Sequence, residues 1–377
     1  MTASWLAPIL VFGLVVFIHE LGHFIAAKAF GVYAPRFSIG FGPALFKRRR
    51  GETEYRVGLL PIGGYVRMAS RLDETGAMLE GGAEEGSTEG QDPNAMIPFG
   101  PKPIPPDRWF ESKPLHARLV IMLAGVTMNL LLGWAVNVGI QKTYAHDFTT
   151  VVDTVLAGRP AAAAGVQAGD SVVAIEGIPV TSWDGMIAQV GASAGKPLRF
   201  DLLRKGEPIQ LTITPTLDSI DDPIHGKKVA MGKVGLASRF DTHTLSWPAA
   251  FRKGTQTTAD MGTLIFSSLR RLATRDVPVS DLGGPVAIMQ QSVQAAKEGA
   301  DSLFGLIALI SINLAIFNLL PIPILDGGQI VVQLLEAAIR RPLSDRAREW
   351  VAGAGLVLIV LLFVTVTFND LKRLIVH

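Results

Sequence analysis

The chain has 377 residues, of which 49% are hydrophobic and 18% charged, and its formal net charge is +2. This balance indicates a membrane protein that carries some soluble mass, and it gives no support to nucleic-acid binding, which needs a strongly basic surface. The sequence contains no cysteine, so disulfides and thiolate chemistry are excluded, and a zinc site must use histidine and carboxylate ligands.

The first predicted span, about residues 5–29, contains the sequence H-E-x-x-H at His19–His23. Residues four apart on a helix leave the same face about one turn apart, so both imidazoles can bind one tetrahedral Zn²⁺. Glu20 is then placed to act as general base on a water molecule. A soluble amphipathic helix is the alternative, but Ala7–Ile18 has no polar face to put in water.

Residues 1–148 are predicted to form the first half of a membrane core. Alternating apolar and polar residues over about 35–68 predict a small antiparallel sheet of hairpins close to the membrane. Residues 73–92 are rich in Gly and Glu, which predicts a flexible acidic loop. A second apolar stretch at about 118–140 is long enough to span a bilayer.

Residues 149–216 have the composition of a soluble domain, in which short apolar strands alternate with glycine turns. Their order resembles a PDZ domain of the kind found in bacterial proteases. The resemblance implies an α+β fold that binds an extended peptide by adding it to a sheet edge. An unrelated small β-domain is the alternative. A single domain is expected, because residues 217–245 are too short and too polar to form a second.

Residues 217–300 are predicted to form a linker followed by helical segments. Two such segments, either of which could lie on the membrane surface, are expected at about 248–273 and 284–298.

The second half of the membrane core, residues 301–377, contains two further spans at about 303–320 and 352–369. Basic residues mark cytoplasmic loops, and they gather at Lys47–Arg50 and again at Arg340–Arg348. Both loops are therefore expected in the cytoplasm, and the PDZ-like domain is expected on the outer side.

This topology brings distant stretches to one depth. His19 lies about 14 residues along the first span, about 21 Å from its outer end at a rise of about 1.5 Å per residue. The second span begins and the third ends in the same inner leaflet, close to Asn129 and Asp326 respectively. Asp326 is therefore available as a third ligand, which leaves the open position of a catalytic zinc site. A helix cap or turn carboxylate is the alternative for Asp326.

These elements closely resemble the site-2 protease family of intramembrane zinc metalloproteases, and more narrowly its bacterial branch called regulator of sigma-E protease. The matching motifs are His19–His23, Gly125-x-x-x-Asn129, the PDZ-like insert and Asn318–Gly327. Better-known members carry two tandem PDZ domains where this chain shows one.

The resemblance implies a single Zn²⁺ held by His19, His23 and Asp326, with Glu20 as the catalytic base. It also implies that several residues lie near the substrate, namely Asn318, Asn129, Gly125 and Pro323. For Asn318, a hydrogen bond to the substrate backbone and a hydrogen bond between helices remain equal alternatives.

The predicted fold class is a polytopic α-helical membrane protein with four transmembrane helices, a membrane-associated β-hairpin sheet and an inserted extracytoplasmic PDZ domain. The expected function is cleavage of a transmembrane segment, in an anti-sigma-factor-like protein already cut on its outer side or in remnant signal peptides. The expected location is the bacterial inner membrane, with the active site near the cytoplasmic leaflet. A non-proteolytic PDZ scaffold and a metal transporter are the competing classes.

Overall fold

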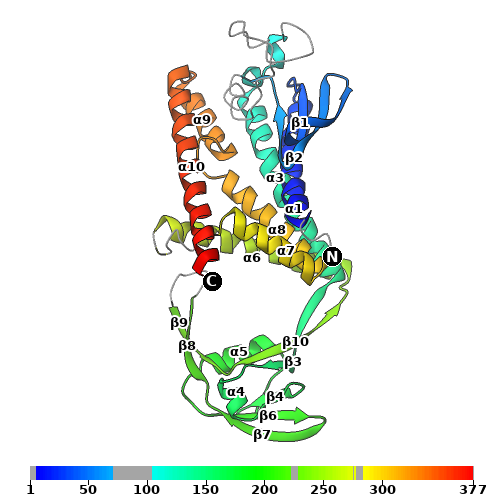
Figure 1. Cartoon of the computed structure of the whole chain (residues 1–377), viewed down its shortest axis with the longest axis vertical. Helices are drawn as coiled ribbons and strands as arrows, with labels where there is room; N and C mark the ends of the chain where they lie inside the picture. Colours follow the sequence, from blue (N-terminus) through cyan, green and yellow to red (C-terminus); the bar gives the residue numbers. More distant parts are fainter. Residues whose placement is uncertain (1–5, 71–103, 222–227, 275, 277–282, 377) are drawn as a thin grey trace. The chain divides into compact units, whose positions relative to one another are not determined.

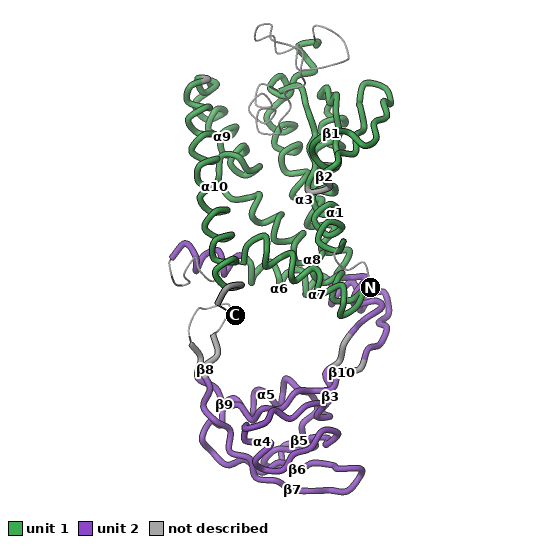
Figure 2. Tube along the Cα trace, in the orientation of Figure 1, with its two compact units in different colours: residues 1–137, 255–265, 278–377 green, residues 138–254, 266–277 purple. Residues whose placement is uncertain are grey.

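The computed structural model describes residues 6–70, 104–221, 228–274, 276 and 283–376 (Figure 1). The predicted acidic loop at 73–92 lies outside the described residues. The chain divides into two compact units (Figure 2). Unit 1 comprises Met1–Asn137, Thr255–Ile265 and Pro278–His377, and unit 2 comprises Val138–Gly254 and Phe266–Val277.

Four helices of the described chain are long and apolar enough to cross a membrane. They are α1 (Ala7–Ala29), α3 (Leu115–Thr143), α8 (Ala300–Asn318) and α10 (Asp345–Val376). The shortest, α8, has 19 residues, which at about 1.5 Å per residue nearly matches a hydrocarbon core of about 30 Å. Each predicted span is thereby confirmed as a long apolar helix, with ends that differ by up to seven residues.

Helices α1 and α3 approach closely at Gly22. A Cβ atom at this position would lie 2.4 Å from the Ala124 carbonyl oxygen, a distance that no side chain can occupy. Beside this contact, Ala26 and Ala27 of α1 pack in one apolar cluster with Ile121 and Met122 of α3. The close approach places the backbone of α3 directly against the H-E-x-x-H turn of α1.

A tight turn joins α8 to the next helix, α9 (Asp326–Ile339). Pro321 and Pro323 cannot continue a helix, and glycine lets α9 begin directly against the turn. A Cβ at Gly327 would lie 2.3 Å from the Leu319 carbonyl oxygen, and one at Gly328 would lie 2.1 Å from that of Ile322. This turn fixes the position of Asp326 at the start of α9.

The predicted sheet at 35–68 is present as β1 (Arg36–Arg50) and β2 (Thr53–Arg67). Both strands bend, so Ser38 lies opposite Arg56 as well as Tyr65. The first part of β1 is therefore flanked on two sides, and residues 64–67 of β2 form an edge with no second strand partner among the described residues.

Ion pairs attach the turn between these strands to the rest of unit 1. Glu52 accepts hydrogen bonds from Arg108 Nη1 at 2.7 Å and Nη2 at 2.8 Å, and Lys28 at the end of α1 also bonds to it. The Arg108 hydrogen bonds lower the pKa of Glu52 to about 2. A depressed pKa means that the contribution to stability is complete above the unfolded-state pKa and is lost only as pH falls toward about 2.

Two short 3₁₀ turns and two further helices complete unit 1 and its connections to unit 2. Their bounds are η2 (Pro106–Arg108), η3 (Phe110–Ser112), α6 (Trp247–Ala273) and α7 (Pro285–Glu298). The last two match the predicted segments 248–273 and 284–298. The buried Asp370 carboxylate of α10 accepts hydrogen bonds from the backbone amides of Gly284, Val286 and Ala287, each at 3.0 Å, and so caps α7.

Unit 2 contains a six-stranded antiparallel sheet in the order β10-β3-β4-β6-β7, with β5 paired to β4. A separate two-stranded sheet joins β8 to β9. The bounds are β3 (Ala145–Val155), α4 (Pro160–Ala163), β4 (Ser171–Ile175), β5 (Ile178–Pro179), α5 (Trp183–Gly191), β6 (Leu198–Arg204), β7 (Glu207–Ile213), β8 (Thr216–Asp221), β9 (Lys228–Lys233) and β10 (Leu236–His243).

The core of unit 2 is made by buried apolar residues of both strands and helices, including Val152, Ile175, Trp183, Phe200 and Ile213. At its side, the buried Asp170 accepts hydrogen bonds from Arg204 Nε and Nη2, both at 2.8 Å. These bonds lower the pKa of the Asp170 carboxyl.

The sheet of unit 2 extends beyond the predicted domain limits of 149–216. Strand β10 was expected to belong to the linker, yet it pairs with β3 from Leu236 opposite Val155 to His243 opposite Ala145. Its partner lies about 80 to 100 residues earlier in the chain, so no local spacing signals the pairing.

Candidate metal centre

The two histidines of α1 face each other inside unit 1. Both are 6% exposed, and their Nε2 atoms are 3.1 Å apart. His23 Nδ1 lies 2.8 Å from the Ile121 carbonyl oxygen of α3. A carbonyl can only accept, so His23 Nδ1 carries the proton and the lone pair of Nε2 is free for a metal.

Asp326 completes a triangle of possible ligand atoms. Its Oδ2 lies 3.3 Å from His19 Nε2 and 3.4 Å from His23 Nε2. In a tetrahedral zinc site with bonds of about 2.0–2.1 Å, two ligand atoms are about 3.3 Å apart. Apart from these two imidazole nitrogens, no polar group of the described residues partners Asp326 Oδ2. The donor set therefore fits Zn²⁺ in both chemistry and spacing.

Gly125 lies against the two imidazole rings. A Cβ at this position would lie 2.4 Å from His23 Nε2 and 2.8 Å from His19 Cε1. Only glycine leaves room for both rings at this turn of α3. Gly125 therefore shapes the metal centre, and it is not among the residues that line the adjoining cavity.

The two predicted asparagines lie on opposite sides of His19. Asn129 Nδ2 is 3.3 Å from His19 Nδ1, and Asn318 Nδ2 is 3.1 Å from His19 Nε2. Asn318 also lines the cavity, whereas Asn129 is completely buried.

A cavity of about 280 Å³ adjoins the ligand triangle. It is lined by His19, Glu20, His23, Val66, Met68, Met122, Asn318, Ile324, Leu325 and Asp326. The Val66 backbone N–H of the edge strand donates a hydrogen bond to the Glu20 carboxylate. Glu20 thus faces the same space as the three ligand atoms without being one of them.

Pro323 does not line this cavity. Its carbonyl oxygen accepts a hydrogen bond from Gln329 Nε2 at 3.0 Å, and α10 approaches it at Gly355. The neighbouring residues Ile324 and Leu325 border the cavity instead. Pro323 therefore contributes to the shape of the turn that presents Asp326.

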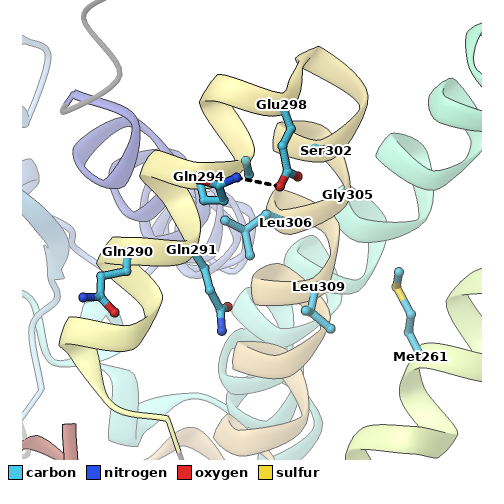
Figure 3. A pocket seen from close by; sticks show the side chains of 10 residues that line it. Met261, Gln290, Gln291, Gln294, Glu298, Ser302, Gly305, Leu306 and Leu309 are labelled. Carbon is cyan, nitrogen blue, oxygen red and sulfur yellow. Dashed lines mark hydrogen bonds between the residues drawn. The ribbon is translucent and has the colours of Figure 1, made fainter. Parts of the chain in front are cut away.

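A larger cavity, of about 580 Å³, lies between α7, α8 and Met261 of α6 (Figure 3). Glu298 is the one ionisable residue among those that line it, and Gln294 Nε2 donates to its carboxylate at 2.9 Å. This cavity lacks the combination of ligands and base that the smaller one has.

Comparison with protein families assigns the class. The family described as peptidase family M50 matches residues 7–362. The chain belongs to peptidase family M50, the site-2 protease family. It is therefore a zinc metalloprotease, which decides against a non-proteolytic scaffold and a metal transporter.

Relatives of this M50 peptidase match along nearly their whole length. Zinc metalloprotease RasP of Geobacillus kaustophilus is 31% identical in an alignment of 422 positions that covers 98% of each chain. Regulator of sigma-W protease RasP of Bacillus subtilis is 29% identical in an alignment of 423 positions that also covers 98% of each chain.

Solved structures also match a part of the M50 peptidase, and one of them is a PDZ domain. The PDZ domain of an SdrC-like protein from Listeria innocua covers 26% of this chain and 99% of its own, with 18% identity and a TM-score of 0.21. This likeness is too small to assign a fold.

Two contacts at the centre of this M50 peptidase could not be found by sequence reasoning. The Ile121 carbonyl holds His23, and the Val66 amide holds Glu20. Both are backbone groups, which every residue carries, so residue type gives no signal for them.

Proposed function

We propose that this protease cleaves a transmembrane segment of another membrane protein within the bilayer. His19, His23 and Asp326 bind the zinc, and Glu20 is the general base. The observation that carries the proposal is the meeting of three ligand atoms and a carboxylate at one cavity, on helices long and apolar enough to cross a membrane.

The residues around the cavity divide the chemistry between them. A bound Zn²⁺ supplies a Lewis acid that polarises a carbonyl and lowers the pKa of a water toward neutrality. Glu20 takes the proton from the attacking water and later gives it to the leaving amine. The Val66 amide holds the Glu20 carboxylate in place for both transfers.

The edge of β2 offers a place for the substrate backbone. A transmembrane helix shields its peptide bonds, because its backbone groups are already paired with one another, so the segment must unwind locally before cleavage. An unwound segment can regain its hydrogen bonds by adding as a strand beside residues 64–67. Asn318 lines the same cavity and is placed to hydrogen-bond that strand.

The expected setting is the bacterial inner membrane. The basic stretches Lys47–Arg50 and Arg340–Arg348 support a cytoplasmic position for the loops that carry them, and hence an active site near the cytoplasmic leaflet. Unit 2 then lies on the outer side.

Unit 2 is proposed as a PDZ-type domain that binds a peptide or ectodomain of the substrate. The antiparallel sheet with its short helices α4 and α5 supports this assignment. The Bacillus subtilis relative is named a regulator of sigma-W protease. An anti-sigma-factor-like membrane protein, first cut on its outer side, is the substrate class that this name supports, and remnant signal peptides are a second.

The proposal predicts that outer domains of the substrate limit cleavage. Purified protease in nanodiscs is expected to cut an ectodomain-truncated membrane substrate at least about 10-fold faster than the intact one, because only the short form can approach the cavity. Product formation on gels gives both rates.

A deletion of residues 145–243 tests the part played by unit 2. Ala145 lies opposite His243 in the sheet, so a short linker can rejoin the chain. The deletion removes β10 together with its partner β3. The deletion is expected to reduce the preference for the truncated substrate. Equal cleavage of both substrates by the complete chain would contradict a filtering role.

A further inference from the structure

Asn129 sits where no substrate can reach it. It is 0% exposed, it does not line the cavity, and its backbone carbonyl accepts a hydrogen bond from Ser311 Oγ at 2.8 Å. Its carboxamide instead lies 3.3 Å from His19 Nδ1. The contact is therefore with the far nitrogen of the His19 imidazole, on the other side of the ring from the Nε2 atom that faces Asp326.

The position of the proton on the His19 ring determines which atom of the Asn129 carboxamide can bond to it. A neutral imidazole carries one N–H, and His19 Nε2 is the atom that faces Asp326 Oδ2 and His23 Nε2. An Nε2 that binds zinc has no proton, so Nδ1 must carry it and act as a donor. The amide nitrogen of Asn129 is also a donor, and two donors cannot bond each other.

The other end of the Asn129 carboxamide resolves the conflict. Asn129 Oδ1 is buried and has no hydrogen-bond partner within the described residues. The two ends of a carboxamide have nearly the same shape, and the hydrogen-bond network determines which end faces a partner. A half turn of the amide brings Oδ1 to His19 Nδ1 and breaks no hydrogen bond that Oδ1 makes.

Helix α3 also provides a hydrogen-bond acceptor for His23. His23 Nδ1 meets the Ile121 carbonyl, so one face of α3 presents an acceptor at 121, open space at Gly125 and a second acceptor at 129. These positions are four residues apart, which puts them on one stripe of the helix. Acceptors on the far nitrogen of metal-bound histidines fix their tautomer and orientation.

We propose that Asn129 is a positioning residue of the zinc site, whose side-chain oxygen accepts the His19 Nδ1 proton and holds Nε2 ready to bind the metal. The proposal rests on the ligand set of the proposed function. It removes Asn129 from the substrate contacts that the family resemblance implied and leaves Asn318 among them.

Zinc affinity of the purified full-length protein, measured by competition with a chelator, tests this role without reference to activity. Asn129→Ala is expected to weaken zinc binding by about 10–100-fold, the usual cost of losing such an acceptor. Asn129→Asp is expected to stay within about 10-fold of the wild type, because a carboxylate accepts the same proton.

Two asparagine variants serve as matched controls. Asn137→Ala removes another buried asparagine of α3, which donates to Thr258 Oγ1 at 3.0 Å, and it is expected to leave zinc affinity unchanged. Asn318→Ala is expected to lower cleavage without weakening zinc binding, since Asn318 faces the cavity and contacts His19 at Nε2 and not at the Nδ1 proton.

The zinc affinity of Asn129→Asp tests the proposal even if Asn129→Ala does not fold. Wild-type zinc affinity in Asn129→Ala, or an affinity in Asn129→Asp more than about 100-fold below wild type, overturns the proposal. Failure of the ligand set itself is distinguishable, because His19→Ala would then also bind zinc as the wild type does.

Discussion

Glu20→Gln is expected to leave about one zinc bound per chain and to reduce cleavage of a transmembrane substrate by about 10²–10⁴-fold. Glutamine has nearly the shape of glutamate but cannot take a proton from water. Glu20 is not one of the three ligand atoms, so zinc binding does not depend on it. The Val66 amide can still donate to the glutamine oxygen, which preserves the cavity.

Elemental analysis and a cleavage assay on the same preparation separate the two effects of this substitution. Glu298→Gln is the matched control, because Glu298 lines a different cavity of unit 1 and is not one of the three proposed ligands. It is expected to cleave at the wild-type rate. Cleavage by purified Glu20→Gln within about tenfold of the wild type would show that Glu20 is not the base.

Asp326→Ala is expected to lower zinc affinity by more than about 100-fold. Loss of an outer hydrogen-bond partner of a ligand already costs about 10–100-fold, and Asp326 is itself a proposed ligand. Within the described residues its Oδ2 contacts no polar group besides the two imidazoles, so the variant loses little that holds the metal-free fold together. The metal-free protein should therefore unfold at nearly the wild-type temperature.

Thermal unfolding with and without added zinc checks this prediction. Zinc stabilises the folded wild type by mass action, and this rise in melting temperature should disappear in Asp326→Ala. Asp301→Ala, in the first turn of α8, serves as control, and its melting temperature should still rise with zinc. A zinc-dependent rise of wild-type size in Asp326→Ala would remove Asp326 from the ligand set.

Sequence reasoning could place the centre of this site because two strong constraints act together. The spacing of His19 and His23 defines one face of one helix, and this is local information. Asp326 is about 300 residues away in the chain. Because the predicted spans have a fixed length and alternate in direction, they put Asp326 at the same membrane depth as the histidines. The structure places its Oδ2 3.3 Å and 3.4 Å from their Nε2 atoms.

Other features depend on packing that no pattern records. Strand β10 pairs with β3 across a long stretch of chain, so the limits of unit 2 were predicted too narrowly. The Ile121 carbonyl and the Val66 amide act through the backbone, and their side chains give no hint of it. Asn129 and Asn318 have the same side chain, and only burial separates the one behind His19 from the one that faces the cavity.

The most direct test of an intramembrane zinc protease is the position of the bond that it cuts. Purified wild-type protein in nanodiscs should be given a single-span membrane substrate trimmed on its outer side, and the products identified by mass spectrometry. Cleavage is expected inside the apolar segment, should stop when a chelator removes zinc, and should return when zinc is restored. Cuts only outside the apolar segment, or cuts that persist without metal, would contradict the account.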